Sequence, residues 1–219
     1  PLYSSAASDV YKRQYNNRTT SFVSKKDLEK AGEIKQGLED VEWMTRYDSV
    51  VVDLKGGPKV GDRYQIFRSA REIRHPVKLV PLGYVVELVG VVTVRETNGG
   101  QAIASIDEAW DRVERGDKLS PYVEPGEGVR HKPAARAMKG IIADTMVERL
   151  GNVGESHLVF LDRGKNDGVE TGNTFVVLRK DDPFTGNSRK NLDEVIGKVM
   201  VVDVKDGAST GLVTMSTTE

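Results

Sequence analysis

Two stretches of this chain decide its fold: Gly61-Asp62-Arg63-Tyr64-Gln65-Ile66-Phe67-Arg68 and, 111 residues later, Gly172-Asn173-Thr174-Phe175-Val176-Val177-Leu178-Arg179. Each opens with Gly followed by Asp or Asn, carries an aromatic residue at its fourth position and ends in Arg. Glycine adopts positive φ without steric cost, and an Asp or Asn side chain bonds a nearby backbone N–H. We therefore predict two copies of one turn, each setting the register of the strand that follows.

The similarity continues on both sides of these stretches, in the same order. Four further pairs match: Ala31–Ile34 with Lys139–Ile142 and Val50–Val52 with Leu158–Phe160 at an offset of 108, and Pro76 with Pro183 and Val89–Val94 with Ile196–Val201 at 107. The offset changes only between predicted strands, as expected when a core fixes strands and loops tolerate insertions. Self-similarity of this kind indicates an architecture of duplicated units.

From this repeat we predict a mostly β protein made of two tandem small β-barrel or β-sandwich repeats of the SH3-like kind, with short helices. The first repeat covers 15–120, a Pro- and Gly-containing linker covers 121–137, and the second repeat covers 138–219. The first repeat ends in Gly116-Asp117, whereas no Gly-Asp pair follows Val213. We therefore expect a second repeat shortened at its C-terminus, and interpret the chain as a metagenomic fragment at both ends.

Residues 1–14 are interpreted as an artefact. The run Asp9-Val10-Tyr11-Lys12-Arg13-Gln14 matches the translation of a transposon end sequence used to prepare sequencing libraries. Such a segment is excluded from fold reasoning. The alternative is a genuine polar N-terminus. On the artefact interpretation, a missing signal peptide carries no information about localisation.

Local patterns predict several elements. Ser24 and Asp27 have the spacing of a capping box, which predicts a short helix over Lys25–Lys30. The β-branched run Tyr84–Val94 predicts a strand, and Asn98-Gly99-Gly100 predicts a hairpin to the next one. We expect a long charged loop over Arg71–Pro81 and a helical turn over Asp107–Val113.

Composition narrows the classes of function. The 219 residues carry a formal net charge of −1, which gives no global basic field for nucleic acid. No apolar run reaches the length of a membrane span. The absence of cysteine excludes disulfides and thiolate chemistry and leaves the compartment open.

No residue set forms a catalytic or metal-ligating pattern. The three histidines, His75, His131 and His157, lie far apart without a partner at ligand spacing. The stretch Asp162–Asn173 fails as a calcium loop, because its glycine is displaced and position twelve is Asn. Asp181-Asp182 is interpreted as solvated charge. We predict no catalytic residue, no metal and no cofactor, and leave the ligand-binding residues unknown.

Two features keep binding hypotheses open. Trp43 and Trp110 either stack on sugar rings or cover a core edge. A basic group on one predicted loop, which the second repeat does not keep, is weak evidence for anion binding: Arg68, Arg71, Arg74 and Lys78.

Taken together, several of these stretches resemble the region C-terminal to the LysM module in Gram-negative LysM peptidoglycan-binding domain-containing proteins: Ala31–Ile34, Gly61–Tyr64, His75-Pro76, Leu82–Val86, Gly90–Val94 and Glu114–Leu119. The stretches Asp167–Phe175 and Pro183–Gly186 are also similar to the C-terminal β domain of a flagellar assembly protein. The LysM module itself is absent, so no sugar-binding residue carries over. The resemblance implies a non-enzymatic protein of the periplasm or cell envelope.

The function expected from this resemblance is that of accessory β domains in a peptidoglycan-associated periplasmic protein, acting in protein–protein contact or spacing. The implied partners are envelope proteins and, through a LysM module outside this chain, peptidoglycan; neither nucleic acid nor a membrane span is expected. The alternative is a small-ligand-binding or divergent enzymatic domain that uses a pocket between the repeats.

Overall fold

The structure is a computed structural model that describes residues 20–39, 41–98, 101–124, 129–146, 153–179 and 194–217. The chain divides into two compact units. We call the described residues of 16–72 and 83–125 the barrel unit, and those of 73–82 and 126–219 the open-sheet unit. The prediction of a mostly β protein is confirmed, since strands dominate and the described residues form one α-helix.

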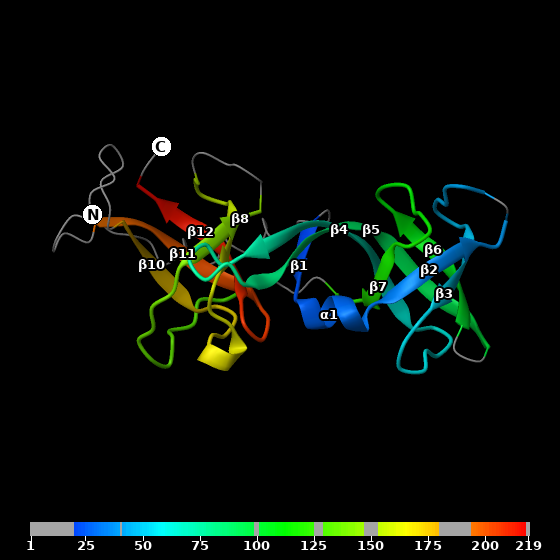
Figure 1. The fold of residues 1–219 in the computed structure, drawn as a ribbon, viewed down its shortest axis with the longest axis horizontal. Coiled ribbons are helices and arrows are strands. Elements are labelled where there is room, and N and C mark those ends of the chain that lie inside the picture. Colours follow the sequence, from blue (N-terminus) through cyan, green and yellow to red (C-terminus); the bar gives the residue numbers. More distant parts are fainter. Residues whose placement is uncertain are drawn as a thin grey trace. The chain divides into compact units, whose positions relative to one another are not determined.

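The barrel unit is built on a seven-stranded sheet whose strand order is β1-β5-β4-β7-β2-β3-β6 (Figure 1). Its strands are β1 (Thr20–Val23), β2 (Gly32–Gly37), β3 (Ser49–Asp53), β4 (Arg63–Arg74), β5 (Pro81–Asn98), β6 (Gln101–Ala109) and β7 (Lys118–Pro121). Because β5 also pairs with β6, the path from β5 through β4, β7, β2, β3 and β6 returns to its start. The unit is therefore barrel-like, and β7 is the strand that joins β4 to β2.

Apolar side chains from the six strands of this ring fill its interior. Ile34 of β2, Ile66 of β4 and Leu119 of β7 are at most 1% exposed and belong to the same cluster. Tyr64 packs against this core while remaining partly exposed. Its burial, and secondly the charge of Asp62, raise the pKa of the Tyr64 hydroxyl.

A second, smaller cluster includes the helix α1 (Lys25–Lys30). Ser24 Oγ accepts a hydrogen bond from the Asp27 N–H, and the Asp27 carboxylate accepts one from the Ser24 N–H, so the predicted capping box is confirmed. Leu28 then packs beside the buried ring of Phe67 on β4. One turn of helix is thus held by its cap and by packing on the sheet.

The open-sheet unit contains a five-stranded sheet in the order β10-β11-β12-β9-β8. Its elements are β8 (Ile142–Thr145), β9 (Leu158–Leu161), the 3₁₀ turn η2 (Lys165–Asp167), β10 (Thr174–Arg179), β11 (Glu194–Val204) and β12 (Ser209–Ser216). In Figure 1 the strands β10, β11 and β12 run as neighbouring arrows, coloured yellow to red. Val159, Val199 and Val201 form the centre of the core, with Phe175 and Val177 partly buried against it.

This strand order equals the order β4-β5-β6-β3-β2 of the barrel unit. The pairings also align the two sheets: Ile34 lies opposite Val52, and Ile142 lies opposite Leu161. Within the described residues no strand takes the place of β7, so β10 and β8 are the two edges of the second sheet. The turns that precede β4 and β10 match too, because Asp62 and Asn173 each accept a backbone N–H three residues earlier.

The register of β9 corrects one predicted offset. Val52 pairs with Ala102, and Leu161 pairs with Ser209, the position that matches Ala102. Val52 therefore corresponds to Leu161 at an offset of 109, and the predicted match of Val50–Val52 with Leu158–Phe160 is one residue out. Three consecutive β-branched residues give no alternation from which to read the register.

Two local predictions were wrong. Residues 71–81 are not a long loop, because β4 continues to Arg74 and β5 begins at Pro81, which leaves only a short connection. Residues 107–113 form no helical turn, because β6 extends to Ala109. The hairpin after Asn98 is confirmed by its pairing with Gln101. Pro183, Asp181, Asp182 and residues 1–14 lie outside the described residues.

Candidate functional site

The Gly-Asp and Gly-Asn pairs of the repeat are structural turns. Gly61 has φ +93°, and the Asp62 carboxylate accepts the Lys59 N–H at 2.9 Å. The Gly61 N–H donates to the Val94 carbonyl and the Val94 N–H donates to the Asp62 carbonyl, both at 2.9 Å. The turn thereby attaches the start of β4 to β5.

The same arrangement recurs at Gly172-Asn173, where Asn173 Oδ1 accepts the Glu170 N–H at 2.9 Å and Val201 makes the reciprocal bonds. It recurs again at Gly116-Asp117, where the Asp117 carboxylate accepts the Glu114 N–H at 2.8 Å. In all three turns the polar side chain holds a backbone N–H three residues before it.

Sequence reasoning missed two further copies of this turn. Asp48 accepts the Thr45 N–H at 2.7 Å, and His157 Nδ1 accepts the Gly154 N–H at 3.0 Å. The residues that precede them, Tyr47 and Ser156, take the positive φ normally given to glycine, at 76° and 68°. In the sequence these two turns show only a polar residue three positions after the residue whose N–H it accepts. Because that spacing is common in any sequence, it does not predict a turn.

His75 and Asp162 are buried together inside the open-sheet unit. His75 Nε2 lies 3.3 Å from Asp162 Oδ2, and His75 Nδ1 accepts the N–H groups of Val77 and Lys78, both at 3.1 Å. Asp162 Oδ1 accepts the Ile141 N–H at 2.6 Å. The pair thus links the β4–β5 connection to Ile141, and Arg163 Nη1 lies 2.7 Å from the same carboxylate oxygen of Asp162 that faces His75.

The remaining histidines do not join this pair. His157 is used in its turn and His131 is exposed. Among the described residues no group of three or more His, Asp or Glu side chains is placed to hold a metal ion. No described helix is long and apolar enough to cross a membrane.

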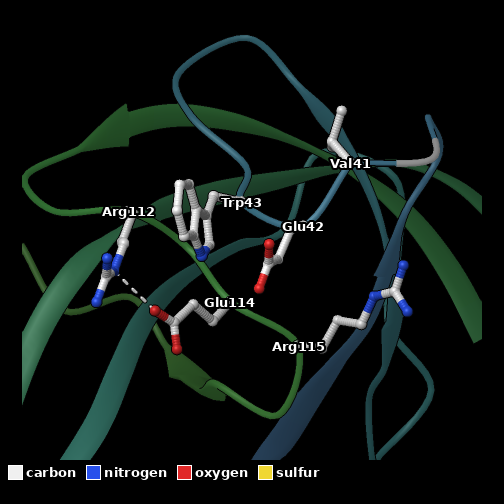
Figure 2. Close-up of a pocket in the computed structure, with 6 residues that line it drawn as sticks. All are labelled: Val41, Glu42, Trp43, Arg112, Glu114 and Arg115. Carbon is white, nitrogen blue, oxygen red and sulfur yellow. Dashed lines mark ion pairs between the residues drawn. The ribbon is translucent and has the colours of Figure 1, made fainter.

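A depression in the barrel unit is the strongest candidate for a binding site. It has a volume of about 600 Å³ and lies between the β2–β3 loop and the β6–β7 loop. Figure 2 draws the six lining residues, three from each loop: Val41, Glu42, Trp43, Arg112, Glu114 and Arg115. Trp43 is 53% exposed, an unusual position for so large an apolar side chain.

Two buried residues fix these loops against each other. The Met44 N–H donates to the Val113 carbonyl at 2.9 Å, and the Val113 N–H donates back to the Met44 carbonyl at the same distance. Both side chains are completely buried in the barrel core. Because Met44 follows Trp43 and Val113 follows Arg112, the core determines where the rim of the depression stands.

Ion pairs arrange one wall of the depression. Arg112 Nε lies 2.8 Å from Glu114 Oε1, the ion pair that is dashed in Figure 2, and the guanidinium stands 5.3 Å from the centre of the Trp43 ring. Arg68 Nη2 lies 3.7 Å from Glu114 Oε2, and Arg68 also binds both carboxylate oxygens of the buried Asp117 at 2.8 Å. The hydrogen bonds from Arg68 to Asp117 raise the pKa of that guanidinium.

Two charged residues that line the depression, one acidic and one basic, lie outside these ion pairs. Glu42 and Arg115 are exposed and take part in none of the ion pairs of the described residues. The site thus offers an exposed indole, a free carboxylate and a free guanidinium on a rim held by the core. Trp and Arg at a fixed rim are the residues that dominate protein–protein contacts.

The other predicted binding features do not line the depression. Trp110 follows β6, is 37% exposed and does not line the depression. In the predicted basic group, Arg68 belongs to the Asp117 network, whereas Lys78 lies in the connection fastened by His75. The comparison with protein-family models finds no match for this chain, and the comparison with curated proteins finds none either.

Proposed function

We propose that this protein is a non-enzymatic module of the Gram-negative cell envelope, an accessory β region of a peptidoglycan-associated periplasmic protein that works by protein–protein contact and spacing. The envelope assignment rests on the sequence resemblance to the region that follows LysM modules. The contact role rests on the depression around Trp43. We infer further that each unit is a small SH3-like barrel or sandwich repeat, supported by the shared strand order.

The observation that carries the contact role is the exposure of Trp43 on a rim fixed by Met44 and Val113. An indole left half in water retains apolar area that a partner surface would cover, and a fixed rim lowers the entropic cost of binding. The neighbouring Glu42 and Arg115 supply charges at the edge, where they favour the correct partner over others.

The distribution of polar side chains supports a non-enzymatic role. Asp48, Asp62, Asp117, Asn173 and His157 all bond turn backbone. Each of these side chains uses an acceptor atom to hold the N–H of the residue three positions before it. Residue types that often serve in catalysis thus stabilise turns in this protein.

The test is retention of envelope proteins by the immobilised chain, compared with a cytosolic extract at equal protein concentration. We expect selective retention by the wild type and its loss in Trp43→Ala. The matched control is Trp110→Ala, which removes a partly exposed indole outside the depression. Retention that is equal for envelope and cytosolic extracts, or unchanged in Trp43→Ala, would contradict the proposal.

A further inference from the structure

The connection between β4 and β5 exposes aliphatic side chains although its backbone is held by hydrogen bonds. Val77, Leu79 and Val80 are 74%, 69% and 47% exposed. His75 Nδ1 accepts the N–H groups of Val77 and Lys78, the His75 N–H donates to the Val80 carbonyl at 2.9 Å, and the Leu79 N–H donates to the His75 carbonyl at 2.8 Å. Three neighbouring aliphatic residues in water, on a turn with a defined backbone, indicate a contact surface.

A further exposed aliphatic residue stands on the other side of the buried His75–Asp162 pair. Asp162 Oδ2 lies 3.3 Å from His75 Nε2, and Asp162 Oδ1 accepts the Ile141 N–H at 2.6 Å. One imidazole and one carboxylate therefore connect the backbone of the β4–β5 connection to Ile141, which is 42% exposed. All these residues belong to the open-sheet unit. We give the name tip surface to the exposed aliphatic residues around this pair and the two lysines beside them: Val77, Lys78, Leu79, Val80, Lys139 and Ile141.

The segments that carry the tip surface are basic and contain no carboxylate. The whole chain has 32 Lys and Arg against 33 Asp and Glu, but residues 73–82 and 129–143 include no Asp or Glu. Lys78 and Lys139 take part in none of the ion pairs of the described residues. The basic residues of the two segments are Arg74, Lys78, Arg130, Lys132, Arg136 and Lys139. Positive charge thus accompanies the exposed aliphatic side chains.

The second of these segments is fixed on the open-sheet unit, although it forms no strand before Ile142. The Lys132 N–H donates to the Gly172 carbonyl at 2.8 Å, and Met138 packs against the core of the second sheet. Arg163 Nε donates to the Lys139 carbonyl at 2.7 Å. Because the backbone beside Lys139 is already ordered, binding through this surface costs less conformational entropy.

We propose that the tip surface binds the surface of an anionic lipid membrane. Val77, Leu79 and Val80 enter the region between headgroups and acyl chains, while Lys78 and Lys139 meet the lipid phosphates. Interfacial binding depends on the burial of apolar area together with attraction to anionic lipids, and the tip surface offers both. An acidic protein would complement the lysines but gives no reason for the exposed aliphatic residues. This inference goes beyond the proposed function and does not rest on it.

Flotation of the full chain with lipid vesicles tests the proposal. One set of vesicles is phosphatidylcholine alone, and the other is equal parts phosphatidylcholine and phosphatidylglycerol. Leu79→Asn removes an aliphatic side chain, and Asn tolerates the left-handed backbone at this position, where φ is 55°. Its matched control is Tyr47→Asn in the barrel unit, where φ is 76° and the residue is 74% exposed.

The charge variants are Lys78→Gln and Lys139→Gln. Their matched control is Lys59→Gln, because Lys59 is an exposed lysine of the barrel unit that belongs to none of the ion pairs of the described residues. Each variant replaces one surface side chain without touching a core residue, so a change in flotation reports on the membrane contact.

We expect binding to the vesicles that contain phosphatidylglycerol and much weaker binding to the neutral ones. Leu79→Asn should lower the binding constant about tenfold, and each lysine variant about fivefold. Tyr47→Asn and Lys59→Gln should leave it unchanged. No binding, equal binding to both kinds of vesicle, or equal losses in the variants and their controls would overturn the proposal. Polyglutamate displacing the vesicles, together with full binding by Leu79→Asn, would point to an acidic protein instead and overturn it too. Because the tip surface and the depression lie in different units, none of these results decides the role of Trp43.

Discussion

His75 Nε2 lies 3.3 Å from Asp162 Oδ2, and both residues are almost fully buried, at 4% and 6% exposure. Since Nδ1 of His75 accepts two backbone N–H groups, the proton of the neutral ring belongs on Nε2, where it faces the carboxylate. A pair that resembles the His–Asp part of a catalytic site thus joins the β4–β5 connection to the backbone of Ile141.

The first prediction concerns this fastening. Asp162→Ala leaves the Ile141 N–H without its acceptor and removes the carboxylate beside His75 Nε2 and Arg163, at a cost of about 1–3 kcal/mol for the buried N–H left unsatisfied. Both tryptophans lie in the barrel unit, so hydrogen exchange of the Ile141 and Val77 amides is the suitable measurement. Asp53→Ala, at an exposed carboxylate, is the control, with an expected change under about 0.5 kcal/mol. Unchanged exchange in Asp162→Ala would argue against the fastening.

The second prediction separates the two roles of Asp117. Asp117→Asn keeps an oxygen for the Glu114 N–H, as Asn173 does in its own turn, but loses the charge opposite Arg68. Asp117→Ala loses both. We expect denaturant unfolding, followed by tryptophan fluorescence, to show a loss of about 1–2 kcal/mol for Asn and a larger loss for Ala.

Asp62→Asn is the matched control for this comparison. The Asp62 carboxylate accepts the Lys59 N–H and belongs to none of the ion pairs of the described residues. Its replacement by Asn should therefore be nearly neutral. If Asp62→Asn and Asp117→Asn destabilised the protein equally, the contribution of the Arg68 ion pair would be refuted.

The third prediction compares two glycines of the same conformation. Gly61 and Gly172 have φ of +93° and +92°, but a Cβ on Gly61 would meet nothing within 4 Å, whereas one on Gly172 would stand 2.2 Å from the Arg130 carbonyl oxygen. Gly61→Ala should cost about 1–2 kcal/mol from the left-handed backbone alone. Gly172→Ala should cost more in thermal unfolding, because the chain at Arg130 must also move. An equal cost would mean that this close approach is absent in solution.

The fourth prediction is a dependence on pH. Hydrogen bonds from Lys118 and then Lys35 lower the pKa of Glu33 from its ordinary value of 4.5. The group therefore contributes stability above about pH 4.5, and this contribution disappears as the pH falls through the lower pKa of the folded state. Glu33 is exposed enough for solvent to screen the effect, so it should be small.

The matched variant is Glu33→Gln, which cannot titrate. Between about pH 5 and about pH 3, unfolding of the wild type should lose stability that Glu33→Gln does not lose. Parallel pH profiles for the two proteins would show that the Lys118–Glu33 contact between β7 and β2 has no energetic role.

Local chemistry made part of this fold predictable from sequence. The capping box at Ser24 and the turns at Gly61 and Gly172 depend on residues within a few positions of each other, and all three form as expected. The repeat also matches Ile34 to Ile142 correctly, because each residue has the same place in the strand pairing of its own sheet. These features need no knowledge of distant contacts.

The predictions that were wrong concern features that depend on contacts between residues far apart in the sequence. The charged stretch after Arg71 resembles a loop, yet it belongs to two long paired strands with a short connection, because strand pairing overrides a polar composition. The depression joins two loops through the backbone bonds of Met44 and Val113, residues with no distinctive pattern. The sequence singles out Trp43, but it carries no pattern that predicts Arg112 and Glu114 as its neighbours.

The most direct measurement of the proposed function is photo-crosslinking in living cells. A benzoylphenylalanine in place of Trp43 in the chain, exported to the periplasm of a Gram-negative host, is irradiated, and the adducts are identified after fractionation. We expect a discrete adduct with an envelope protein from position 43 and none from position 110. Adducts that are absent, equal at both positions or formed with unrelated abundant proteins would contradict the claim that the depression around Trp43 is a protein-contact surface of the cell envelope.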